Sequence, residues 1–230
     1  MKLVFRNSLA GFVLSLAAAS LALPSAASAQ DRNPATGEAS QPIALDEPSA
    51  GLKSVSDFDQ ISDERERSIA IFEETGKVLT HPRCVNCHPA GNSPLQTMAM
   101  TPHQPPVQRG DANFGVPGMM CNTCHGPENA LVVGQSPDIK SIPGNPNWHL
   151  APIEMAWEGK SLADICVQIK DQNRNGGLDL AALVEHMAED DLVGWGWEPG
   201  EGREPVPGTQ QQFGELYKAW AATGAHCPES

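Results

Sequence analysis

The chain has few aromatic residues: 6 Phe, 5 Trp and 1 Tyr make up 5% of its 230 residues. Such a composition is lean for a core that is packed by side chains alone, and the 20 Pro and 21 Gly favour loops instead. We therefore expect something other than side chains to fill part of the interior.

Positive charge is also scarce, because 15 Lys and Arg face 28 Asp and Glu, which gives a formal net charge of −13. An acidic surface of this kind disfavours nucleic acid and anionic membranes as partners. It favours partner proteins that dock through a basic patch.

Long apolar runs are absent after the N-terminus. Residues 1–29 combine basic Lys2 and Arg6, an apolar stretch through Leu23 and a small-residue cleavage site that ends at Ala29, which is typical of a secretory signal peptide. The alternative, a transmembrane anchor, needs a longer run. No cysteine follows the cleavage site, so a lipoprotein anchor has no attachment point. We expect a mature protein of net charge −15, without membrane insertion, in the periplasm.

Strand-like alternation is absent too, and the expected fold class is mainly α with long ordered loops. Residues 30–55 read as a flexible leader, and residues 56–230 as the folded domain. A first helix is expected from Ser56 or Asp57 to Val78. Apolar spacing and capping boxes predict three further helices, within 161–171, 178–191 and 209–224.

Two motifs stand out, "RCVNCHPAGN" and "CNTCHGPEN". Each contains two cysteines three positions apart followed by a histidine: Cys84, Cys87 and His88, then Cys121, Cys124 and His125. A zinc site would use all four thiolates, but the motifs are 33 residues apart instead of about 15–20, and zinc does not explain the histidines. A dithiol redox centre needs a thioredoxin-like context that is absent.

Covalent haem attachment explains every element of both motifs. The two thiols add to the porphyrin vinyl groups, and the adjacent histidine becomes the proximal iron ligand, here His88 and His125. The sequence therefore predicts two covalently bound haem c groups, whose apolar faces substitute for a side-chain core. Since 88–120 has no helices of its own, we expect one merged di-haem cytochrome c-like unit with close haems.

The distal iron ligands are less constrained by the pattern. His103, in the stiff segment "MTPHQPP", and His186, at the margin of a helix face, are the candidates. Met155 and His149 are held in reserve. Two histidines on one iron would lower its potential relative to a Met/His pair.

Two cysteines lie outside the motifs, Cys166 and Cys227. In an exported protein, a leftover pair suggests a disulfide. The alternative is a cysteine thiolate that binds a haem iron, which would imply sulfur chemistry.

The segments "WHLAPIEMAWEGKSLADICVQIKD", "EHMAEDDLVGWGWEPG" and "TGAHCP", together with the two haem motifs, carry a family resemblance. Over roughly residues 75–228 the chain resembles bacterial di-haem c-type cytochromes described as isoquinoline 1-oxidoreductase-type subunits. That resemblance implies that a periplasmic molybdenum hydroxylase donates the electrons. It also draws attention to Trp195 and Trp197, which we expect to pack on a haem edge.

The sequence thus predicts a periplasmic electron-transfer protein that passes electrons from a dehydrogenase or oxidoreductase partner to a respiratory acceptor, without catalysis of its own. The alternative is a di-haem redox enzyme, peroxidase-like or thiosulfate-oxidising, in which one iron has an open or displaceable distal position. A haem-based sensor would need an output domain, and none is visible.

Overall fold

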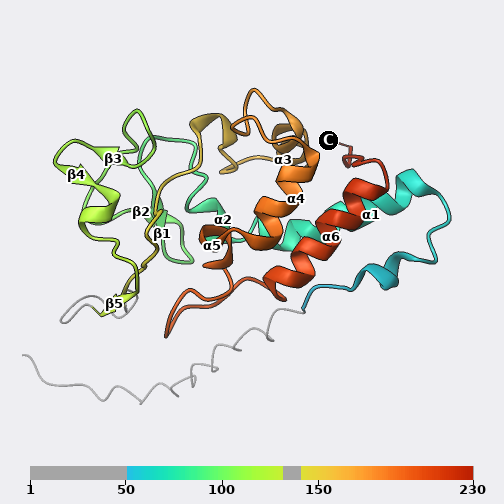
Figure 1. Cartoon of the computed structure of the whole chain (residues 1–230), viewed down its shortest axis with the longest axis horizontal. Helices are drawn as coiled ribbons and strands as arrows, with labels where there is room; N and C mark the ends of the chain where they lie inside the picture. Colours follow the sequence, from blue (N-terminus) through green and yellow to red (C-terminus); the bar gives the residue numbers. More distant parts are fainter. Residues whose placement is uncertain (1–50, 132–140, 230) are drawn as a thin grey trace, which may run out of the picture. The chain divides into compact units, whose positions relative to one another are not determined.

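The computed structural model describes residues 51–131 and 141–229, so the predicted signal peptide and most of the leader lie outside the described residues. The described part is mostly helical, with six α-helices, three small two-stranded hairpins and long loops (Figure 1). This confirms the mainly α prediction. No helix within these ranges is long and apolar enough to span a bilayer.

The helices and the short 3₁₀ turns follow one another along the chain with the hairpins between them. The helices are α1 (Glu64–Leu79), α2 (Pro82–Val85), α3 (Leu162–Lys170), α4 (Leu180–Glu189), α5 (Asp191–Gly194) and α6 (Gln210–Ala222). The 3₁₀ turns are η1 (Val55–Phe58), η2 (Cys121–Thr123) and η3 (Ile153–Met155). The strands are β1 (Leu95–Gln96), β2 (Thr101–Pro102), β3 (Gly115–Val116), β4 (Met119–Met120), β5 (Ala130–Leu131) and β6 (Ser141–Ile142).

The first helix begins later than its apolar pattern predicts. A separate 3₁₀ turn, η1, occupies Val55–Phe58, and α1 starts only at Glu64. The side chain of Asp63 accepts a hydrogen bond from the backbone N–H of Glu66, which makes Asp63 the N-cap. This cap satisfies one of the free N–H groups of the first turn and so sets the start of the helix.

The three later helices form within the ranges that the sequence predicts, two of them with the expected capping boxes. Ser161 and Asp164 exchange hydrogen bonds at the start of α3, and Thr209 and Gln212 do the same at α6. The side chain of Asp179 caps α4. Local sequence is sufficient here because each cap and its first apolar turn lie within a few residues of each other.

The helices build a side-chain core of their own. α6 packs against both α1 and α4. Phe72, Phe213, Tyr217 and Trp220 are each no more than 1% exposed, and the rings of Phe72 and Trp220 lie 4.9 Å apart. The expectation of a core lean in side chains is therefore wrong for the helical part, because most of the Phe and Tyr there are concentrated in one aromatic cluster.

The ordered part also begins before the predicted boundary at residue 56. Leu52 is 8% exposed and belongs to the core, where it lies against Gly208. The backbone N–H of Lys53 donates to the carboxylate of Glu74 on α1. At least residues 52 and 53 of the predicted leader are thus packed on the domain.

The three hairpins were not expected from the sequence. β1 pairs with β2, β3 with β4 and β5 with β6, all antiparallel, and each strand has only two residues. Strands this short show no alternation of apolar and polar residues that a sequence pattern could reveal. Their role is positional, because they fold the loops around the two cysteine motifs.

Cys166 and Cys227 form the predicted disulfide, which ties α3 to the segment after α6. Cys166 is fully buried in the core. A disulfide fits an oxidising compartment outside the cytoplasm, in agreement with the predicted export.

The N-cap assignment predicts that Asp63→Ala lowers the free energy of unfolding by about 1 kcal/mol. Asp59→Ala is the matched control, because Asp59 lies within the helix expected from the sequence but outside α1; its effect should stay below about 0.5 kcal/mol. Urea unfolding followed by circular dichroism measures both. Equal effects of the two variants would contradict the late helix start.

The disulfide closes a segment of 61 residues, so its removal should destabilise the fold through the larger entropy of the unfolded chain. We expect Cys166→Ala with Cys227→Ala to lower the free energy of unfolding by about 2–4 kcal/mol. Val167→Ala, at an exposed neighbour on α3, serves as the control. An unfolding midpoint equal to that of the control would show that the bond adds no stability.

Candidate functional site

The first motif sits at the end of a short helix. α2 contains Cys84, and the side chain of His81 caps it by accepting from the N–H of Arg83. Backbone hydrogen bonds continue past the helix, from the N–H of His88 to the carbonyls of Cys84 and Val85. This turn brings both cysteines and the following histidine into one compact loop.

The ring of His88 is held from two sides. Its Nδ1 lies 2.7 Å from the carbonyl oxygen of Met155, and its ring stacks on Trp157 with 3.5 Å between centres and 8° between planes. A carbonyl oxygen only accepts, so Nδ1 carries the proton. Burial lowers the pKa of His88 to about 4, so the ring is neutral near pH 7. Its Nε2 then has a free lone pair for a metal.

The second motif is built in the same way from different elements. Nδ1 of His125 donates to the carbonyl of Pro143 at 2.6 Å, and the His125 ring stacks on Trp148 with 4.7 Å between centres and 8° between planes. Pro143 directly follows β6, and the β5–β6 pairing brings it back to the motif. Burial is the largest cause that lowers the pKa of His125, so this ring is also biased towards the neutral form.

Both motif histidines therefore have their Nδ1 fixed by a backbone carbonyl and a ring face covered by a tryptophan. In metal sites, a hydrogen bond of this kind sets the tautomer and the orientation of the ligating ring. Four other residues supply these supports, namely Met155 and Trp157 for His88 and Pro143 and Trp148 for His125.

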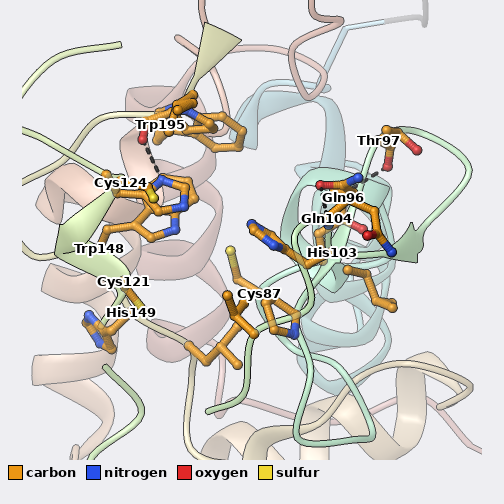
Figure 2. A pocket seen from close by; sticks show the side chains of 18 of the residues that line it. Cys87, Gln96, Thr97, His103, Gln104, Cys121, Cys124, Trp148, His149 and Trp195 are labelled. Carbon is orange, nitrogen blue, oxygen red and sulfur yellow. Dashed lines mark hydrogen bonds between the residues drawn. The ribbon is translucent and has the colours of Figure 1, made fainter. Parts of the chain in front are cut away.

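A cavity of about 520 Å³ lies beside the second motif, within the usual size range of cofactor sites. Figure 2 shows His103 directed into it from the side opposite Cys124 and Trp148. Most of its wall is apolar. The apolar lining residues are Pro94, Leu95, Met98, Ala99, Pro105, Val107, Met119, Met120, Ile142, Pro143, Trp148, Leu150 and Trp195.

His103 follows β2 and faces the ring of His125. Its backbone N–H donates to the carbonyl of Pro94, and its Nδ1 donates to that of Pro105, so Nε2 is the ring nitrogen left for another partner. The ring centres of His103 and His125 are 6.1 Å apart. Two imidazoles on opposite sides of one metal, each bonded at about 2 Å, would have centres about 6.3 Å apart. The separation fits a shared iron.

The other candidate ligands are placed differently. His186 lies on α4, where its Nδ1 is 3.3 Å from the carboxylate of Asp190. His149 stacks on Phe114 at the cavity wall. Met155 is 6% exposed and belongs to the helical core, which removes its side chain from the wall of the cavity.

The two motifs lie next to each other. Cys87 of the first motif lines the same cavity as Cys121 and Cys124 of the second. Burial, with a smaller contribution from the nearby Cys121, raises the pKa of Cys87 to about 11. The two motifs thus adjoin at one cavity.

The geometry does not favour the two rival chemistries of the motifs. A reactive dithiol needs a lowered thiol pKa, whereas burial raises the pKa of Cys84 to about 12. A structural zinc site needs four ligands around one point. Across residues 51–131 and 141–229, no three His, Cys, Asp or Glu side chains are placed to hold a metal ion directly.

Sequence reasoning singled out the motif residues and His103 as candidates but not the residues that contact His88 and His125. Trp148 and Trp157 could have been suspected, because they are two of only five tryptophans. The two tryptophans that we expected to pack on a haem edge lie in different places. Trp195 lines the cavity, whereas Trp197 packs on Phe213 in the core. The cavity also contains Arg83 and Arg203, for which the sequence shows no signal.

Comparison of the chain with family models, with curated proteins and with solved structures gave no match. The function must therefore be argued from the site itself.

Proposed function

We propose that this chain is an electron-transfer protein with two covalently bound haem c groups. One observation carries the proposal: His88 and His125 are prepared in the same way for axial ligation, and His103 faces His125 with 6.1 Å between ring centres. The cysteines that would attach each haem lie directly beside these histidines. The residues and the cavity beside the second motif therefore fit the group.

The thiols would hold each porphyrin by covalent bonds. Cys84 and Cys87 serve one haem, and Cys121 and Cys124 the other. Each S–H adds across one vinyl double bond, so that a C–S bond forms and the hydrogen goes to the neighbouring carbon, with no change in electron count. A bound haem iron supplies one-electron chemistry between Fe(III) and Fe(II).

The histidines would fill the axial positions. His125 and His103 serve the second haem, and His88 with His186 the first. If both positions were filled by these histidines, no coordination position would be left for a substrate, which favours an electron carrier over an enzyme. Two histidine ligands also favour a low potential.

Electrons would pass between the haems because the attachment sites adjoin. Cys87 lines the cavity of the second haem, which supports a short path from one macrocycle to the other. The acidic surface favours docking of a donor or acceptor with a basic patch, and the disulfide and the N-terminal segment favour the periplasm. A dehydrogenase, such as a molybdenum hydroxylase, would donate, and a respiratory acceptor would receive.

The di-haem enzyme remains the second candidate because of one feature of the first site. His186 is 39% exposed and its Nδ1 is near Asp190, so it is held less firmly than His103. An iron at His88 with a displaceable distal ligand could bind a small substrate such as a peroxide.

Haem attachment is tested by counting haem per chain after expression in a haem-maturing host. We expect two haems in the wild type, one in Cys121→Ala with Cys124→Ala, and one in Cys84→Ala with Cys87→Ala, by pyridine haemochrome absorbance and intact mass. Cys166→Ala with Cys227→Ala is the matched control and should keep two. A wild type with zinc and no haem would overturn the proposal.

Axial ligation is tested by absorbance spectra with and without carbon monoxide. We expect a low-spin wild type that does not react, and a His103→Ala variant in which one haem per chain becomes high-spin and binds carbon monoxide. His149→Ala, at the same cavity, should behave like the wild type. Carbon monoxide binding in His149→Ala but not in His103→Ala would assign the distal position to His149 instead.

The same spectra separate the carrier from the enzyme. If the wild type already binds carbon monoxide at one haem, that iron has an accessible position and the enzyme becomes the better reading. His186→Ala then identifies the haem concerned. If His186 is the ligand at the first motif, this variant should change the spectrum of the first haem and leave that of the second haem unchanged.

A further inference from the structure

The cavity beside the second motif contains two arginines with no carboxylate partner. Arg83 and Arg203 both line it. Neither forms an ion pair within the described residues, where the ion pairs are Lys77–Glu74 and His186–Asp190, and Glu204 is the one carboxylate whose charge acts on Arg83 from a longer distance. Arg83 is only 7% exposed. A buried charge without a partner is costly, so an anion is expected beside it.

The two side chains are fastened close to each other. Nε of Arg83 donates to the carbonyl of Glu204 at 2.8 Å, and Glu204 is the residue after Arg203. Arg203 is itself fixed by hydrogen bonds to the hydroxyl and carbonyl of Ser141 and to the carbonyl of Pro199. Both arginines line the cavity that also contains His125. Positive charge therefore accumulates near the second histidine.

Several donors of this group have no acceptor in the described part of the chain. Arg83 uses only its Nε–H there, which leaves the four N–H bonds of its two terminal nitrogens. The buried indole N–H of Trp195, on the same cavity wall, also lacks a partner. Buried donors are normally satisfied, and guanidinium groups match carboxylates with two parallel hydrogen bonds.

We propose that Arg83 and Arg203 bind the two propionate carboxylates of the haem attached at Cys121 and Cys124. This inference rests on the proposed function. Two guanidinium groups balance two propionates, and the apolar part of the same cavity receives the macrocycle. Because Arg83 precedes Cys84 directly, it links the first motif to the haem of the second.

Arg83→Gln and Arg203→Gln test this in the full-length holoprotein, with Arg65→Gln on the exposed side of α1 as the matched loss of one charge. We expect both cavity variants to keep two haems per chain. The midpoint potential of one haem should move to a more negative value, because loss of a nearby positive charge favours Fe(III). The propionate bending band in resonance Raman spectra should also shift.

Arg83→Lys distinguishes the effect of the hydrogen bonds from the effect of the positive charge. Lysine keeps the positive charge but not the planar pair of donors, so the potential should stay near the wild-type value while the Raman band moves. If Arg83→Gln does not mature, Arg203→Gln alone decides the outcome.

Two failures are distinguishable. A wild type without covalent haem would overturn the proposed function and this inference together. Two haems in every variant, with potentials and propionate bands equal to those of Arg65→Gln, would overturn the arginine site alone and leave the electron-transfer proposal intact.

Discussion

The structure depends most on one repeated interaction: the Nδ1–H of a motif histidine donates to a backbone carbonyl far along the chain. Met155 supplies that carbonyl for His88, and Pro143 supplies it for His125. Each bond places a proton on Nδ1 and leaves Nε2 free. Because each carbonyl comes from outside the motif, the segments around Pro143 and Met155 have to return to the two histidines.

The described part of the molecule has two kinds of interior, a helical core and a loop region with a cavity. The helical part is closed by the aromatic cluster of Phe72, Phe213 and Trp220 and by the disulfide between Cys166 and Cys227. The loop part holds the apolar cavity and the four thiols outside the disulfide. The helical part gives a rigid support on which the short hairpins position the motif histidines. Catalytic and binding groups in general need packed surroundings that fix them in place. The same division explains why so few aromatic residues suffice.

The site also shows how charge is distributed in an acidic protein. The surface is negative, whereas Arg83 and Arg203 concentrate positive charge at the cavity. An anionic group would be attracted to this place and repelled elsewhere. Burial lowers the pKa of both His88 and His125 and so favours their neutral forms. In the proposed function, the guanidinium groups would bind anions and the imidazoles would bind a metal.

Sequence alone determined the features that depend on neighbours along the chain. The caps of α3 and α6, the cysteine–histidine motifs and the pairing of the two remaining cysteines all follow from short spacings or from elimination. The sequence pattern placed the start of α1 too early, because apolar positions continue on the N-terminal side of the cap at Asp63. Only the tertiary structure decided that the ring of His103 lies near that of His125, that Met155 turns its side chain to the core and its carbonyl to His88, and that Arg83 and Arg203 line one cavity. Each of these pairings joins segments that are far apart in the sequence and connected by turns. Turns show no hydrophobic periodicity, so the sequence pattern cannot predict which segments the folded backbone brings together.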